Sequence, residues 1–211
     1  MNTSLATIVL FTMMSFIVSC TGNGPMSGSG SQTTNSITVA VRADSITVTG
    51  ERDLTVQIYA AGYVPVDDSG YADTGMLCGG SCLFSALPPD TYTVLVTDPV
   101  ERVSAIVQHI QVTGTGNDVY TDSLEPGGSL GGTVQLNGQP LIAGFVYVKG
   151  TPFSTVSNET GTYRLSPLPF GSYRLSVRPN SESQIDDFEL QETIDISSYS
   201  PENTRDIVID P

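Results

Sequence analysis

Cysteine and histidine, the residue types that most often carry chemistry, are rare in this 211-residue chain. The chain has three cysteines, at positions 20, 78 and 82, and one histidine, His109. Metal-assisted and general-base hydrolysis usually draw on histidine, and we expect no strand-to-helix elbow that would present a nucleophilic serine. The sequence therefore predicts no catalytic residue, no metal site and no cofactor, in a protein that is not an enzyme.

His109 lies in a strand-like sequence of alternating residues. We expect its side chain on a wetted face with Gln111, opposite Ile106, Ile110 and Val112. A histidine in such a place is a surface residue rather than a ligand or a catalytic base.

Cys20 follows an uncharged apolar stretch, Leu5–Val18, that is too short to span a bilayer as a helix and is typical of an export signal. Directly behind it, Ile17-Val18-Ser19-Cys20 resembles the lipobox of bacterial lipoproteins, whose cysteine is acylated. The resemblance implies a signal peptide at residues 1–19, cleavage after Ser19 and a lipid anchor on Cys20. The alternatives are an ordinary signal peptide and an uncleaved anchor.

The other two cysteines, Cys78 and Cys82, stand close together in a chain that an export signal would place in an oxidising compartment. We expect a local disulfide between them, which would fix a turn more than it stabilises the fold, because closing so short a loop removes little entropy. Zinc and redox sites need further ligands or a two-residue cysteine spacing, and the sequence offers neither.

Acidic and aromatic residues offer two further candidate sites. Asp67-Asp68 with Asp73, and Asp186-Asp187, carry oxygen ligands but lack the spacing of a calcium loop, so we expect solvated acidic loops. Tyrosine is the commonest aromatic residue, and a sugar ring could stack on tyrosines at outward or loop positions. The candidate ligand surface consists of Tyr59, Tyr63, Tyr71 and Tyr147.

The composition favours many short strands joined by tight turns, since hydrophobic residues make up 39% and there are 21 glycines, 13 prolines and no tryptophan. No stretch after Val18 shows a helical period. The net charge of −14 would repel a phosphate backbone, which excludes nucleic acid as a partner.

Two breaks in composition divide the chain. Residues 20–36 are rich in Gly, Ser, Thr and Asn and are predicted to form a flexible tether after the lipidated cysteine. The sequence Glu125-Pro-Gly-Gly-Ser129 separates two segments of strands and turns. We place one domain at residues 37–125 and a second at residues 129–211.

The two segments repeat one another. Phe84–Val96 aligns without gaps on Leu165–Val177, and in each a Leu-Pro corner precedes a strand with alternating residues. This alternation predicts two tandem antiparallel β-sandwich domains of about seven strands each, in an all-β protein. The residues expected to face inward are Tyr92, Val94, Val96, Tyr173, Leu175 and Val177, and those expected to face water are Thr91, Thr93, Ser172, Arg174 and Ser176.

The second segment carries the fuller pattern. Asn137-Gly138 is a hairpin signal and Gly161 closes a turn, within GTVxxxGxPLxxxxVxVxGT and then YxLxxLPxGSYxLxV. This arrangement resembles the carboxypeptidase regulatory-like domain, a small transthyretin-like sandwich, over Leu130–Val177. The resemblance implies closing strands at residues 188–196 and 205–209, and a module that accompanies enzymes without supplying reacting groups.

The first segment reads as a divergent copy through its Leu87–Tyr92 corner. The acidic, Gly-rich stretch of residues 62–80 is expected to form a specialised loop. Strands are expected near residues 37–41, 46–48, 54–60, 83–85, 91–97, 105–112 and 118–121.

These expectations favour a non-enzymatic, membrane-anchored envelope lipoprotein that acts as a structural spacer or protein-interaction module. Its partners would be a membrane, through the lipid anchor, and another envelope protein. Thr21 follows the cysteine where lipoproteins retained in the inner membrane of enteric bacteria have aspartate, which favours the outer membrane. The alternatives are a carbohydrate-binding lipoprotein with a glycan as ligand, and an accessory subunit of an envelope peptidase or transport complex.

Overall fold

The computed structural model describes residues 35–41, 54–77, 81–114, 116–121, 123–179 and 187–210. Every regular element in these ranges is a β-strand, as the sequence predicted. Within them, the structure contains no helix with the length and apolar character needed to cross a bilayer. The signal peptide, Cys20 and most of the tether lie outside the described residues, so those predictions stay predictions.

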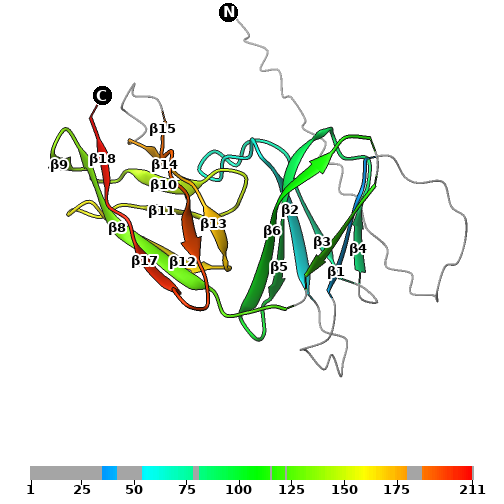
Figure 1. Ribbon diagram of the computed structural model, residues 1–211. Coiled ribbons are helices and arrows are strands. Elements are labelled where there is room, and N and C mark those ends of the chain that lie inside the picture. Colours follow the sequence, from blue (N-terminus) through cyan, green and yellow to red (C-terminus); the bar gives the residue numbers. More distant parts are fainter. Residues whose placement is uncertain are drawn as a thin grey trace, which may run out of the picture.

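The first sandwich packs a three-stranded sheet on a four-stranded sheet (Figure 1). In the smaller sheet, β1 pairs antiparallel with β4 and parallel with β7. In the larger sheet, β2 and β5 lie in the middle and β3 and β6 at the edges. The bounds are β1 Ile37–Val41, β2 Thr55–Ala60, β3 Ala72–Met76, β4 Ser81–Phe84, β5 Asp90–Asp98, β6 Val103–Val112 and β7 Asn117–Thr121.

The second sandwich is built around β8, which pairs antiparallel with β12 and β9 and parallel with β17 and β18. The facing strands run in the order β11-β10-β14-β15, and β13 pairs with β16. The bounds are β8 Gly128–Leu136, β9 Gln139–Pro140, β10 Phe145–Val148, β11 Ser154–Val156, β12 Thr162–Leu168, β13 Gly171–Tyr173, β14 Leu175–Arg178, β15 Phe188–Glu189, β16 Ile194–Ile196, β17 Glu202–Thr204 and β18 Ile207–Ile209.

The two sandwiches share one chain topology. The first strand of each, β1 or β8, lies between an antiparallel neighbour, β4 or β12, and a parallel one from the end of the segment, β7 or β17–β18. The larger sheets correspond in the same way, β3-β2-β5 matching β11-β10-β14. The structure therefore confirms the predicted fold class of two tandem, mainly antiparallel β-sandwiches.

Inward-facing side chains follow the predicted alternation. Each sandwich has its own core cluster, one drawn from residues 37–124 and the other from residues 130–209. All six side chains predicted to face inward along β5, β13 and β14 are buried, with at most 1% of each exposed. Period-two burial is the reason, because successive side chains on a strand point to opposite faces.

The repeated Leu-Pro corner has the same hydrogen bond in both sandwiches. The hydroxyl of Tyr92 donates to the carbonyl of Pro88 at 2.7 Å, and that of Tyr173 donates to the carbonyl of Pro169 at 2.5 Å. The same pairing of a tyrosine hydroxyl with an upstream carbonyl forms the tyrosine corner of other β-sandwiches. The sequence repeat is thus also a repeat of local structure, because a buried hydroxyl needs a partner.

The structure has the predicted turns at Asn137-Gly138 and at Gly161, and all three residues have a positive φ. Asn137 and Gly138 have φ of 53° and 72°, as a two-residue hairpin between β8 and β9 demands. Gly161 has φ of 75°, and a Cβ there would lie 2.6 Å from the carbonyl oxygen of Val134. A side chain at Gly161 would therefore strain the backbone and collide with β8.

The stretch of residues 62–80, expected to be a specialised loop, is different in the structure. It contains β3, an edge strand paired antiparallel with β2. The prediction missed this strand because its sequence, Ala-Asp-Thr-Gly-Met, has no alternation and only Gly75 is buried. A Cβ at Gly75 would lie 2.6 Å from Sγ of Cys82, so glycine lets β3 approach the core.

The corner tyrosines provide a test of the repeated fold. Tyr173→Phe should lower the free energy of unfolding by about 1–2 kcal/mol, because the carbonyl of Pro169 loses its donor inside the core. Urea unfolding followed by circular dichroism measures this change. Tyr199→Phe is the matched control, since Tyr199 is 99% exposed and should change nothing. Equal stability of both variants would contradict a structural role for the corner.

Candidate functional site: the junction of the two sandwiches

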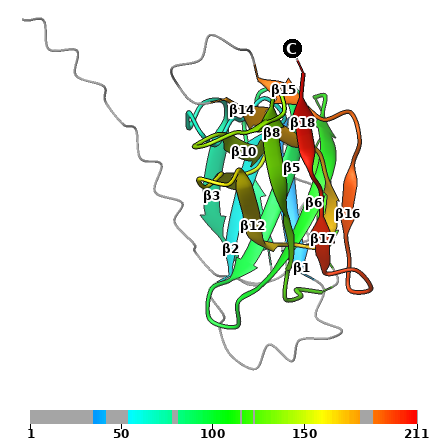
Figure 2. The same ribbon diagram turned by 90° about the vertical axis from the view of Figure 1, so that its left-hand side faces the viewer.

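The outward face of the larger first sheet is covered by the second sandwich, and this junction is the candidate site (Figures 1 and 2). Thr93 and Ser176, which were predicted to face water, are only 9% and 3% exposed. That prediction was wrong because alternation separates the two faces of a strand without telling whether the second face meets water or another domain. Leu95 and Tyr59, on the same face as Thr93, are each 5% exposed.

Phe153, in the turn between β10 and β11, links the apolar groups of both sandwiches. Its ring packs against a cluster of Tyr59, Tyr63 and Leu95 from the first sandwich. It also packs edge-on against Tyr173 of the second core, with ring centroids 6.1 Å apart. One aromatic side chain thus joins the second core to an apolar cluster of the first sandwich that lies apart from the first core.

Backbone atoms meet at the same place. The amide of Gly150 donates to the carbonyl of Tyr63 at 2.8 Å. Gly150 has φ of 72°, and a Cβ there would lie 3.3 Å from Cα of Ala61. The absence of a side chain allows this close approach of the two sandwiches.

A β-bulge in β6 brings Ile106 to the junction. The register between β5 and β6 shifts between Tyr92 and Val94, and His109 has φ of 62°. One extra residue at this bulge reverses the facing of the strand, so Ile110 is buried in the first core while Ile106 packs against the second. The prediction that both lie on one face was therefore wrong, although His109 is exposed as expected.

Arg178, at the end of β14, forms a charged clamp across the junction. Its Nε and Nη2 donate to the two carboxylate oxygens of Asp187 at 2.7 and 2.9 Å, and its Nη1 donates to Asp67 of the first sandwich at 2.6 Å. The Tyr147 hydroxyl donates to the same Asp187 carboxylate at 2.6 Å. The arginine side chain is 25% exposed, so solvent screens this network less than a free surface pair.

The clamp changes the acid–base behaviour of its members. The Arg178 guanidinium holds the pKa of the Asp187 carboxyl below its ordinary value, because it stabilises the carboxylate form. Burial, together with the hydrogen bond to Asp187, raises the pKa of Tyr147 to about 12. Both shifts favour the charged carboxylate and the neutral phenol that the hydrogen bonds require.

The tyrosines proposed as a ligand surface do not share an exposed face. Tyr59, Tyr63 and Tyr147 are buried, and the rings of the first two lie in the junction with centroids 4.9 Å apart and planes tilted by 49°. Tyr71 is half-buried and packs edge-on against Tyr92 at 5.9 Å. Tyr63 and Tyr71 lie outside regular strands, as expected, but the outward exposure expected of Tyr59 and Tyr147 was wrong, because both side chains are buried.

Cys82 points into the first core and is 7% exposed, so burial raises the pKa of its thiol. Cys78 lies outside the described residues, and so does Cys20. The predicted bridge and the predicted lipidation therefore stay predictions.

The aspartates considered as calcium ligands have other partners. Asp67 binds Arg178, and Asp68 accepts a hydrogen bond from Tyr63 at 2.8 Å. Asp187 belongs to the clamp, whereas Asp186 lies outside the described residues. In the described part of the chain, no three His, Cys, Asp or Glu side chains gather as metal ligands would.

Ser129 stands in the order Gly-x-Ser-x-Gly, between Gly127 and Gly131. It lies within β8, is 5% exposed, and its amide donates to the carbonyl of Pro201 at 2.7 Å. A nucleophile elbow needs a sharp turn that exposes the hydroxyl, so this serine is a strand residue.

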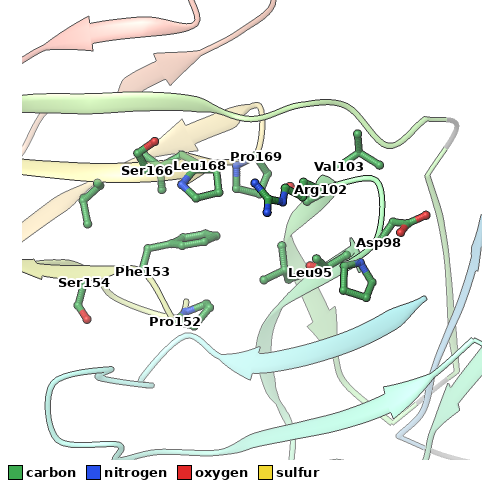
Figure 3. Close-up of a pocket in the computed structure, with 15 residues that line it drawn as sticks. Leu95, Asp98, Arg102, Val103, Pro152, Phe153, Ser154, Ser166, Leu168 and Pro169 are labelled. Carbon is green, nitrogen blue, oxygen red and sulfur yellow. The ribbon is translucent and has the colours of Figure 1, made fainter. Parts of the chain in front are cut away.

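A groove of ≈ 440 Å³ opens along the junction. Its walls come from the β5–β6 turn of the first sandwich and from the proline corner of the second. Figure 3 shows the Phe153 ring inside it, between Leu168 and Pro169 on one wall and Leu95 on the other. Arg102 supplies a positive charge at its rim. Such a proline- and leucine-lined surface suits an extended peptide segment better than a reaction that needs polar groups.

Sequence reasoning did not identify Arg178, Phe153 or Ile106 as junction residues. Leu95 and Tyr59 were the available signal, because each is a large apolar residue on a face otherwise occupied by hydroxyl groups. Two such residues on neighbouring strands indicate a covered face.

No protein-family model and no curated protein matches the chain. Among solved structures, it is similar to the minor pilin GBS52 of Streptococcus agalactiae at 16% identity and a TM-score of 0.36, covering 83% of this chain and 94% of the pilin. A streptococcal ancillary pilin is similar at 14% identity and a TM-score of 0.36, covering 85% of this chain and 63% of that one, so this chain spans less than two thirds of that pilin.

The shaft pilin SpaA of Lactobacillus rhamnosus GG, as a double mutant, is similar at 12% identity and a TM-score of 0.30, covering 86% of this chain and 98% of the pilin. At identities and TM-scores this low, no residue role is transferred from the pilins. The fold assignment rests on this chain's own strands and their pairing.

The clamp predicts a pH dependence of stability. Since the pKa of Asp187 is lowered in the folded state, its contribution is present above the ordinary carboxyl value of 3.8 and is lost as the pH falls below it. Urea unfolding at about pH 6 and about pH 3 should show a smaller loss for Asp187→Asn than for the unmodified protein. Glu202→Gln is the control, because its exposed pair with Arg164 contributes little. An unchanged pH dependence in Asp187→Asn would contradict the clamp.

Proposed function

We propose that the protein is a non-enzymatic spacer of the bacterial envelope, in which the two sandwiches form one rigid body held to a membrane through Cys20. The observation that carries this proposal is the junction, where Phe153 packs against apolar groups of both sandwiches and Arg178 binds carboxylates of both sandwiches. Domains joined only by a linker move relative to one another by default, so a junction of this kind favours a fixed geometry.

The junction combines three kinds of contact that resist different motions. The aromatic contact of Phe153 resists separation, and the hydrogen bond from Gly150 to Tyr63 fixes the distance between the two backbones. The bidentate pair of Arg178 with Asp187, extended to Asp67, resists rotation because its geometry is directional. A spacer needs this combination, since it must transmit an orientation.

The second part of the proposal is the lipid anchor predicted near the N-terminus. An acylated Cys20 would hold the chain at a membrane, and residues 21–36, if fully extended, would reach about 55 Å from it. Thr21 favours the outer membrane as the site of anchoring. The proposed partner is another envelope protein, for which the proline-lined groove of the junction offers a docking surface.

We further infer that the second sandwich is of the carboxypeptidase regulatory-like, transthyretin-like type. Support comes from the parallel pairing of the first and last strands, β8 with β17 and β18, and from the turn at Gly161. In proteins that carry such a module, it supports neighbouring domains, which agrees with a structural role.

Rigidity is the property that a spacer requires, and it can be measured directly. Backbone ¹⁵N relaxation should give one common rotational correlation time for amides of both sandwiches. Arg178→Ala should separate the two values, because the clamp to Asp67 is lost. Arg164→Ala is the matched control, since this arginine makes only an exposed pair with Glu202 at 3.8 Å. Two different correlation times in the unmodified protein would contradict the proposal.

The anchor is tested by metabolic labelling with palmitate in a bacterial host. The full chain should incorporate the label and fractionate with membranes, whereas Cys20→Ala should do neither. Cys82→Ala serves as the cysteine control and should keep the label, because Cys82 is buried in the first core. A Cys20→Ala protein that is still acylated would remove the anchor from the proposal.

A further inference from the structure

A second cleft, of ≈ 260 Å³, lies at the junction, and residues of both sandwiches line it. The chain has one histidine and one lysine, His109 and Lys149. Both line this cleft, His109 from the first sandwich and Lys149 from the second, together with Arg174. Three basic side chains therefore gather in a molecule whose net charge is −14.

The backbone has a positive φ at His109 and at Gly150, the residue after Lys149. His109 has φ of 62° at the bulge of β6, a conformation uncommon for a residue other than glycine. Lys149 directly follows β10 and precedes Gly150, which approaches Ala61 of the first sandwich. Bulges are used in proteins to redirect a side chain, and here the bulge places the only histidine at a boundary between domains.

The positive charge of the cleft is only partly balanced by carboxylates. Arg174 pairs with Glu189 at 3.3 Å, and the charge of Lys149 helps to lower the pKa of Asp187. In the described ranges, however, neither Lys149 nor His109 has a carboxylate within ion-pair distance. Arg164, Arg178 and Arg205, by contrast, are each paired with acidic side chains. The cleft is thus a local positive site on an acidic protein, which would attract a small anion and repel a polyanion.

Further polar groups complete the lining. Thr93, Gln108 and Ser172 contribute hydroxyl and amide groups, and Glu189 contributes carboxylate oxygens. These groups offer donors and acceptors around the cationic site, which is the chemistry needed to bind the hydroxyls of a sugar. The volume lies just below the roughly 300–1,000 Å³ of sites for drug-sized ligands, which leaves room for a ligand of about one sugar ring.

We propose that this cleft binds a carboxylate-bearing sugar residue of the hexuronate class. The carboxylate lies on the side of Lys149 and His109, and the ring hydroxyls exchange hydrogen bonds with Gln108, Thr93 and Glu189. This site does not involve the tyrosines that the sequence had suggested for a glycan. It is also independent of the spacer role, because a rigid junction with an empty cleft would still act as a spacer.

Titration of the full chain with sodium glucuronate tests the proposal, with chemical shifts of the Gln108, Gly150 and Ser172 amides as the site-specific readout. Glucuronate should shift these amides in a saturable manner, and glucose and acetate should each bind at least about tenfold more weakly. Lys149→Gln should weaken binding about tenfold or more, a change equal to about 1.4 kcal/mol. Lys149→Arg should restore most of the affinity.

Arg164→Ala is the control for a general loss of positive charge and should bind glucuronate unchanged. Thermal unfolding of each variant separates loss of the site from loss of the fold. Acetate binding as tightly as glucuronate would overturn the sugar, and the absence of saturable shifts with glucuronate would overturn the site. Neither result would affect the relaxation test of the rigid junction.

Discussion

The structure depends on the burial of both faces of the β2–β5–β6 sheet. One face forms the first core, and the second sandwich covers part of the other, where Tyr59, Thr93 and Leu95 are buried. That second face is mostly hydroxyl-bearing, so its contact is unlike a core: a few apolar anchors, Leu95, Tyr59 and Phe153, are surrounded by polar groups. Interfaces between specific partners have this composition, with an apolar centre and a polar rim. The two sandwiches thus meet as preformed partners with their own cores, and the geometry between them is specified by directional contacts.

The charged contacts of the junction also offset the repulsion between the two sandwiches. Two acidic sandwiches repel one another, and the net charge of −14 would favour their separation. Arg178 reduces this repulsion at the junction, because its guanidinium binds Asp67 of one sandwich and Asp187 of the other. In the described part of the chain, four of the six Lys and Arg side chains lie at the junction, namely Arg102, Lys149, Arg174 and Arg178.

The sequence was sufficient for the repeat and the cores, because Tyr92 and Tyr173 occupy equivalent positions and alternate residues after them are apolar. The sequence did not show what the second face of each strand contacts. Period two assigns a residue to a side of the sheet, but the same hydroxyl-rich side can meet water or another domain. A single extra residue at His109 also reversed the facing of Ile106, and no sequence pattern marks such a bulge. The edge strand β3 was missed for a related reason, since an exposed edge has little burial to leave an alternating pattern.

The groove and the second cleft lie on the junction, and each is lined by residues of both sandwiches. A ligand in either one contacts two domains at once, so its binding free energy depends on the angle between them. By linkage, such a ligand stabilises the arrangement that it binds, and a junction already held by Phe153 and Arg178 loses less entropy on binding than a mobile one. Rigidity and recognition are therefore not competing roles for this chain. The contacts that would make the two sandwiches the proposed spacer would also keep both clefts preorganised, so the proposed structural role and the proposed binding role are compatible.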